Sequence, residues 1–154
     1  MPKEIERKFL VKGDSWRRLA EGSSYSQGYI STQKKATVRV RIAGNQGYLT
    51  IKGPSVKYSR SEFEYPIPIK DAQEMLDTLC DRPLIEKTRY RVDYNGLTWE
   101  IDEFDGINKG LIIAEVELSD ENQQIELPSW IGEEVSDDPK YFNSNLVKHP
   151  FSQW

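Results

Sequence analysis

The sequence is short of the features on which several common architectures depend. Its 154 residues include one cysteine, so no intramolecular disulfide forms and the fold does not need an oxidising compartment. No apolar stretch approaches the roughly 20 residues that span a bilayer, and no signal-peptide core follows the first charges. We therefore expect one cytoplasmic domain, residues 1–154, with no membrane partner.

Histidine and net positive charge are also scarce. The only histidine, His149, stands in the tail before Pro150, which leaves Ser/His and Cys/His hydrolases without an evident base. The formal net charge is −4, from 25 acids and 21 bases, whereas nucleic-acid-binding domains are usually basic. This acidic balance predicts no nucleic-acid partner. No GxxxxGK[ST] loop is present, which excludes a P-loop NTPase.

The chain instead has many short segments in which apolar and charged residues alternate, as in strands with one buried face. We predict eight of them: Glu4–Lys12, Tyr25–Ile30, Thr37–Ala43, Gly47–Gly53, Arg60–Ile67, Ile85–Tyr94, Leu97–Phe104 and Leu111–Leu118. Asn95-Gly96 suits a tight hairpin, because both residue types tolerate a positive φ.

Helical signals are fewer. Capping residues and apolar spacing predict helices over Asp14–Glu21, Asp71–Arg82, Ser119–Glu126 and Pro139–Lys148. The sequence therefore predicts a β-rich α+β fold, an antiparallel sheet with a few peripheral helices.

The charged faces of the strands have an unusual composition. Four predicted strands carry acid pairs at alternate positions, and arginine is frequent among the basic residues. Arginine binds phosphate oxygens in a bidentate manner, whereas an ordinary solvated surface mixes polar residues of many kinds. Eight antiparallel strands are enough to close a barrel. If the charged faces point inward, the barrel encloses a charged tunnel whose acids suit Mg²⁺ or Mn²⁺ and whose bases suit a polyanion.

The order of these charged pairs resembles that of the CYTH superfamily, the triphosphate tunnel metalloenzymes. Glu4-Ile5-Glu6-Arg7-Lys8 matches the family's ExExK signature, and the other pairs follow it along the chain. The closing stretch Asp138-Pro139-Lys140-Tyr141-x-Asn143-x-Asn145-Leu146 is similar to the end of the small bacterial members. The resemblance implies an eight-stranded closed tunnel with a C-terminal plug helix, from which Lys140 is a candidate to reach the interior.

The resemblance also implies roles for individual residues. The metal ligands would be Glu4, Glu6, Glu115, Glu117 and Asp102. Phosphate oxygens would be bound by Lys8, Arg39, Arg41, Lys52, Lys87, Arg89 and Arg91, of which Lys8, Arg39, Arg41 and Lys52 would also be catalytic. Tyr29, Glu62, Glu64 and Glu100 have no assigned role.

The implied activity is hydrolysis of inorganic tripolyphosphate with Mg²⁺ or Mn²⁺, and a homodimer is compatible with it. The alternatives are a class IV-type adenylate cyclase, a thiamine or nucleoside triphosphatase, and a polyphosphate-binding module without turnover. A lipocalin-like carrier is disfavoured, because it would need apolar inward faces.

Overall fold

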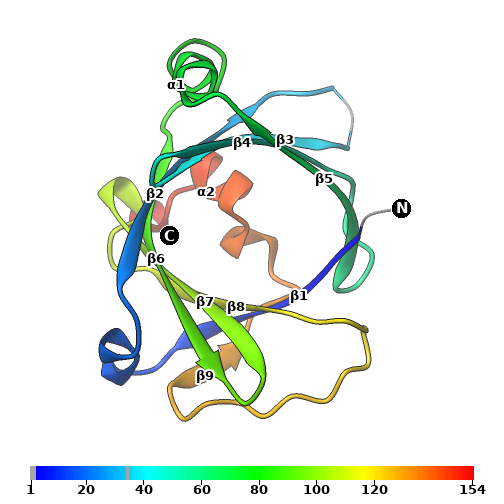
Figure 1. Cartoon of the computed structure of the whole chain (residues 1–154), viewed down its shortest axis with the longest axis vertical. Coiled ribbons are helices and arrows are strands. Elements are labelled where there is room, and N and C mark those ends of the chain that lie inside the picture. The colour runs from blue at the N-terminus through cyan, green and yellow to red at the C-terminus, as the bar shows by residue number, and fades with distance from the viewer. Residues whose placement is uncertain (1–2, 34) are drawn as a thin grey trace.

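The computed structural model describes residues 3–33 and 35–154. Within them the strands are β1 (Lys3–Val11), β2 (Gly22–Ile30), β3 (Thr37–Ala43), β4 (Gln46–Lys52), β5 (Ser59–Ile67), β6 (Ile85–Tyr94), β7 (Leu97–Phe104), β8 (Ile112–Glu117) and β9 (Ile131–Glu134). Neighbouring strands are antiparallel, in the order β5-β4-β3-β2-β6-β7-β8-β1, and β1 also pairs with β5. This last pairing closes an eight-stranded barrel, which appears as a ring in Figure 1. The predicted closed barrel is therefore confirmed.

Strand β9 lies outside the closed ring and was not predicted. It pairs with the second half of β1, where Phe9 lies opposite Glu134 and Val11 opposite Ile131. Arg7 attaches it further, donating from Nε and Nη2 to the two carboxylate oxygens of Glu134 at 2.9 and 2.6 Å. Four residues are too few for an alternating pattern to be recognised, so this strand depends on its partner rather than on local sequence.

The helices are shorter than the sequence suggests. Helix α1 covers Ile69–Thr78, and the C-terminal prediction divides into a 3₁₀ turn at Pro139–Tyr141 and helix α2 at Asn143–Lys148. The predicted first helix is a single 3₁₀ turn, Ser15–Arg18. Two further 3₁₀ turns are Gly106–Asn108 and Phe151–Gln153.

The helix predicted over Ser119–Glu126 is wrong. The segment does begin with capping interactions, because the Ser119 amide and hydroxyl both donate to Gln123 Oε1 at 2.7 and 2.9 Å. The chain then continues as turns and irregular structure up to Pro128. Ile125 packs on the core while Leu127 is exposed, so the segment lacks the continuous apolar stripe that a helix would bury.

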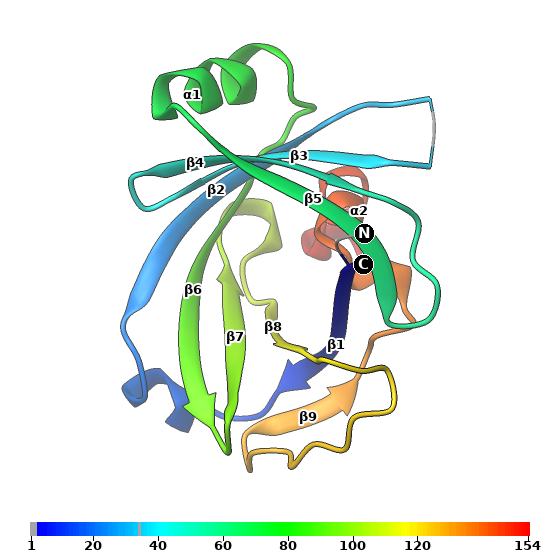
Figure 2. The same cartoon turned by 45° about the vertical axis from the view of Figure 1, so that its right-hand side comes forward.

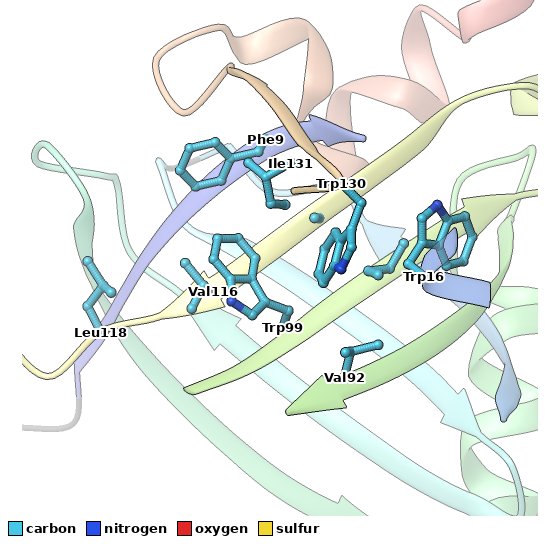
Figure 3. Packing of buried hydrophobic residues seen from close by; sticks show 10 residues of the cluster. Phe9, Trp16, Val92, Trp99, Val116, Leu118, Trp130 and Ile131 are labelled. Atoms are coloured by element: carbon cyan, nitrogen blue, oxygen red, sulfur yellow. The ribbon is translucent and has the colours of Figure 1, made fainter. Parts of the chain in front are cut away.

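The main apolar core lies outside the barrel wall, because the apolar faces of β1, β6, β7 and β8 point away from the tunnel. Trp99 is fully buried there and packs against Phe9 and Trp130, with ring centroids 5.5 and 5.9 Å apart (Figure 3). Trp16, from the first 3₁₀ turn, and Ile131 at the start of β9 cover the same face. A second outer cluster joins Val40 of β3 to Ala72 and Leu76 of α1.

A third apolar cluster fills one end of the barrel interior. Ile85 and Ile113 have the same strand parity as the inward-facing Lys87 and Glu115, and they contact Leu146 and Val147 of α2. In Figure 1, α2 lies within the outline of the ring of strands, whereas α1 lies outside it. The turned view in Figure 2 shows α1 across the outer side of β3 and β4. The expected plug helix is therefore α2, and the interior beyond it is polar.

The Asn95-Gly96 hairpin is confirmed, since both residues have positive φ, 53° and 82°. None of the helices within the described residues is long and apolar enough to cross a membrane.

Candidate functional site

The barrel interior contains a cavity of about 680 Å³ that is lined mainly by charged side chains. All of the predicted site residues except Asp102 line it, and Glu62, Glu64 and Glu100 line it as well. They meet because alternate residues of a strand point to the same side of a sheet, so the charged faces of β1 and of β3 to β8 turn inward together, whereas β2 contains no charged residue.

The basic and acidic side chains occupy different halves of the wall. The adjacent strands β4, β3 and β6, with β2 between the last two, carry the basic residues Lys52, Arg39, Arg41, Lys87, Arg89 and Arg91. The adjacent strands β7, β8, β1 and β5 carry the acids Glu100, Glu115, Glu117, Glu4, Glu6, Glu62 and Glu64. Lys8 of β1 and Arg60 of β5 are the basic exceptions on the acidic half. A polyanion and a cation can therefore be bound side by side.

Asp102 lies beneath the basic half and is 1% exposed. Its Oδ1 accepts a hydrogen bond from Arg89 Nε at 2.7 Å, and its Oδ2 accepts from Lys87 Nζ at 2.7 Å and Arg89 Nη2 at 2.8 Å. Both oxygens are thus bound to basic groups of this chain. The sequence pattern placed Asp102 on the correct face, but it did not indicate that these two neighbours surround it.

The basic side chains repel one another. Burial, followed by the charges of Arg39 and Arg89, lowers the pKa of Arg41 to about 10. The pKa of Lys87 is lowered to about 7, mainly by burial and further by the charges of Arg89 and Arg41. The negative charge of Asp102 acts in the opposite direction. Carboxylates pair with Lys52, Lys87, Arg89 and Arg91, whereas Arg39 and Arg41 donate to the neutral side chains of Thr50 and Gln27. The excess of positive charge on this half is therefore greatest around Arg39 and Arg41.

Three residues of the basic half were missed by sequence reasoning. The ring of Tyr25 lies between two guanidinium groups, with its centroid 5.0 Å from Arg41 Cζ and 4.9 Å from Arg89 Cζ. Gln27 accepts a hydrogen bond from Arg41 Nε at 2.7 Å, and Asn143 accepts one from Lys87 Nζ at 2.9 Å. Parity along β2 could have indicated Tyr25 and Gln27, but nothing local places Asn143 beside Lys87.

On the acidic half, two carboxylates are paired with lysines. Glu4 Oε2 accepts from Lys52 Nζ at 2.7 Å, and Glu115 Oε1 lies 3.4 Å from Lys8 Nζ. Burial opposes ionisation of Glu4, yet the charge of Lys52 is the main cause that lowers its pKa to about 2. Burial likewise opposes ionisation of Glu115, but Lys8, Arg89 and Lys87 hold its pKa well below the ordinary value. These carboxylates are therefore anionic at neutral pH.

The remaining acids repel one another. Burial, with the charges of Glu115 and Glu4, raises the pKa of Glu6 well above its ordinary value. Burial and the neighbouring Glu4 raise the pKa of Glu62 to about 7. Partial removal from water, together with Glu4 and Glu100, raises the pKa of Glu117. These three carboxyl groups therefore retain protons more readily in the free protein than ordinary glutamates do, and a bound cation would favour their ionised form.

The acidic half fits a divalent cation, although the protein does not form a complete coordination shell by itself. Glu4 Oε1 is buried without a hydrogen-bond partner among the described residues, and Arg60 Nε is 3.7 Å away. Within residues 3–33 and 35–154, no group of three or more His, Cys, Asp or Glu side chains is arranged to hold a metal ion. Mg²⁺ typically takes one or two carboxylates together with substrate phosphate oxygens and water, which agrees with both observations.

Two further residues are placed by the structure. Tyr29 lines the cavity, and its hydroxyl accepts from Gln27 Nε2 at 2.9 Å. Lys140 is exposed outside the cavity, with Nζ 4.5 Å from the ring centroid of Trp154, so it does not reach the tunnel.

A closed antiparallel barrel with a polar interior, basic on one half and acidic on the other, defines a protein that binds a small, highly charged anion together with a cation. The comparisons with known proteins agree with this class. The CYTH domain model matches residues 2–147, and the chain belongs to the CYTH domain family.

Relatives are similar over nearly their whole length. The chain is 54% identical over 154 residues to the inorganic triphosphatase of Acetivibrio thermocellus, covering 100% of this chain and 99% of the relative. It is 34% identical over 152 residues to the inorganic triphosphatase of Nitrosomonas europaea, covering 94% and 96%. The crystal structure of the inorganic triphosphatase NE1496 superposes with a TM-score of 0.65 at 33% identity, covering 96% of this chain and 95% of that chain.

Proposed function

We propose that this protein, as a single tunnel domain, hydrolyses inorganic tripolyphosphate to diphosphate and phosphate with the aid of a divalent metal ion. The observation that carries the proposal is the division of one closed interior into a basic half and an acidic half. A linear triphosphate is small and highly anionic. Basic side chains of one half can bind its phosphate oxygens, and a metal ion held by the acidic half can bind them as well. Relatives named inorganic triphosphatases, one of them 54% identical, support this choice of substrate.

On the substrate side, the residues that would bind the phosphate chain are Lys52 of β4, Arg39 and Arg41 of β3, and Lys87, Arg89 and Arg91 of β6. Lys8 projects from the acidic half and would bind the chain from the opposite side. Cations held in place around the transferring group stabilise the charge that builds up on it and on the leaving diphosphate. Lys8, Lys52, Arg39 and Arg41 would therefore contribute to catalysis as well as to binding.

On the metal side, Glu4, Glu6, Glu115 and Glu117 would hold Mg²⁺ or Mn²⁺. Family membership implies a divalent metal ion, and the choice between these two belongs to the proposal. A bound divalent ion neutralises phosphate charge and lowers the pKa of coordinated water. We assign Asp102 a different role from the one implied by the resemblance, namely holding Lys87 and Arg89, because both of its oxygens accept hydrogen bonds from them.

Ligand binding would rearrange the ion pairs of the free tunnel. Lys52 and Glu4 are 2.7 Å apart, although one is assigned to phosphate and the other to the metal. Lys8 and Glu115 form a similar pair at 3.4 Å. When triphosphate attracts the lysines, the carboxylates are released toward the cation, so the two ligands should favour each other's binding.

The direct test is to identify the products from tripolyphosphate, ATP and thiamine triphosphate, with and without Mg²⁺ or Mn²⁺. We expect metal-dependent release of phosphate that is fastest from tripolyphosphate. Cyclic AMP and diphosphate from ATP would identify a cyclase instead, and tight binding without any product would identify a polyphosphate-binding protein. The cytoplasmic location and the homodimer remain predictions from the sequence.

A further inference from the structure

Gln27 of β2 is a buried neutral residue among the cations of the basic half. Its side chain is 0% exposed, and all of its polar groups are used. Oε1 accepts from Arg41 Nε at 2.7 Å, while Nε2 donates to the hydroxyl of Tyr29 at 2.9 Å and to Asn143 Oδ1 at 3.2 Å. The amide is therefore fixed in one orientation, with its oxygen toward Arg41.

Asn143, the first residue of α2, continues this chain of hydrogen bonds. Its Oδ1 accepts from Gln27 Nε2 and also from Lys87 Nζ, at 2.9 Å. The Lys87 ammonium is fixed between Asn143 and Asp102, whose Oδ2 is 2.7 Å away. A continuous series thus runs Arg41–Gln27–Asn143–Lys87–Asp102–Arg89 and joins β3, β2, α2, β6 and β7.

The kind of acceptor matters because the cations are crowded. Arg41 and Lys87 are both buried and repelled by neighbouring arginines, and this repulsion must be offset for their side chains to remain in one position. A further carboxylate in addition to Asp102 would offset the repulsion, but it would also cancel positive charge that a polyanion needs. An amide oxygen accepts a strong hydrogen bond from a cation and leaves its net charge unchanged.

We propose that Gln27 and Asn143 are positioning residues for triphosphate binding, which hold Arg41 and Lys87 in place by hydrogen bonds while preserving their positive charge. The inference rests on the proposed function, since it assumes that the basic half binds the phosphate chain. It gives α2 a second function besides filling one end of the barrel, because Asn143 links this helix directly to the basic half of the wall.

The test measures tripolyphosphate binding by isothermal titration calorimetry, first without divalent metal and then with Mn²⁺. Gln27→Met and Asn143→Ala remove the acceptors, and we expect each to weaken binding by roughly ten- to a hundredfold, the effect of losing a buried hydrogen bond to a charged group. Gln27→Glu and Asn143→Asp keep an acceptor but add a negative charge, and we expect them to weaken binding as well. The double variant should lose less than the product of the single effects, because one network is broken.

Gln46→Glu and Asn45→Asp are matched controls, since they make the same chemical changes at exposed positions outside the cavity. They should bind like the wild type. Circular dichroism and Tm identify variants that fail to fold, and if Gln27→Met fails, the half-buried Asn143 decides the question alone. A wild type that neither binds nor hydrolyses tripolyphosphate overturns the proposed function. A wild type that binds, with Asn143→Ala binding equally well, overturns this inference only, and normal binding by Gln27→Glu overturns the requirement for a neutral acceptor.

Discussion

The interior carboxylates of this barrel have different surroundings, even though all of them lie on the inward faces of their strands. Asp102 accepts three hydrogen bonds from two cations, whereas Glu117 is exposed to the cavity and lies opposite Glu6 in the pairing of β1 with β8. A buried anion with saturated oxygens maintains the positions of its partners. A solvated anion beside other anions is suited to attract a cation.

Replacing these two acids by their amides should therefore affect different properties, namely stability for Asp102 and metal affinity for Glu117. Asp102→Asn leaves two buried cations without their anion, so we expect a loss of about 3 kcal/mol in the free energy of unfolding and little change in Mn²⁺ affinity. Glu117→Gln should lower Mn²⁺ affinity severalfold and change stability by less than about 0.5 kcal/mol. Chemical denaturation and Mn²⁺ titration measure both quantities. Weaker metal binding by Asp102→Asn at unchanged stability would return Asp102 to the metal site.

Lys87 should couple triphosphate binding to proton uptake. Its pKa is about 7 in the free protein, mainly because of burial, so it is largely neutral at pH 8.5 and protonated at pH 5.5. Nearby phosphate charge raises a lysine pKa. Binding at pH 8.5 should therefore take up a proton that is not taken up at pH 5.5, and affinity should fall as the pH rises above 7.

Calorimetry in buffers of different ionisation enthalpy measures this uptake. Tripolyphosphate titrates by itself, so the quantity of interest is the difference between the wild type and Lys87→Met. Equal proton uptake by the two proteins at pH 8.5 would assign the titration to another group.

For individual site residues, the sequence predicts which face of a strand they occupy but not which neighbours they contact. Alternation in β1, β3 and β8 sufficed to predict that Glu6, Arg41 and Glu115 share one interior, because strand parity is a local property. Whether an inward residue lines the cavity or lies under it depends on neighbours from other strands, so parity alone does not distinguish the surroundings of Asp102 from those of Glu115. Asn143 stands in the closing motif, but its contact with Lys87 could not be predicted, because it arises from the docking of α2 beside β6.

Among the elements, β1 and β4 are connected electrostatically across β5. Lys52 of β4 extends past β5 to Glu4 of β1, so a basic residue of one half is bound to an acid of the other. In the free protein, Lys52 and Glu4 are therefore bound to each other rather than available to phosphate and metal.

Lys52→Met should therefore have opposite effects on the two ligands. Without its lysine partner, Glu4 is available, and Mn²⁺ alone should bind severalfold more tightly, while tripolyphosphate alone should bind more weakly. Lys57→Met removes the same charge from an exposed residue that also lines the cavity, and it should change both affinities less. Equal effects of the two variants would mean that overall charge, rather than the pair with Glu4, controls metal binding.

Elements with long alternating patterns were predicted well, and short elements were not. The eight barrel strands were found because each buries one face, whereas β9 has four residues and depends on β1 for its pairing. The helix expected after Ser119 has a local start signal but lacks the continuous apolar stripe that a helix would bury. The strand β9 was missed because its pairing is a tertiary contact, whereas the helix was wrongly predicted because its capping residues were given too much weight.

Across the whole molecule, ligands in the tunnel would bind both halves of the wall at once and so stabilise the closed barrel. At a tripolyphosphate concentration 100 times its Kd, linkage predicts about 2.7 kcal/mol of stabilisation, which corresponds to roughly 5–10 °C in Tm for a chain of this size. Orthophosphate at the same concentration should give a smaller shift, and Arg41→Ala should largely remove the effect of tripolyphosphate. A shift of similar size with sulfate at matched ionic strength would indicate a general ion effect.

The closure of the barrel by β1 also has a consequence for synthesis on the ribosome. Among the strands of the barrel, β1 is synthesised before its partners: it pairs with β5 through Lys3–Ile5, with β8 at residues 112–117 and with β9 at residues 131–134. The nascent chain must therefore leave one side of β1 unpaired until β8 has been translated. The charged interior can form only after that point, so the barrel should acquire its ligand-binding capacity in one step rather than gradually.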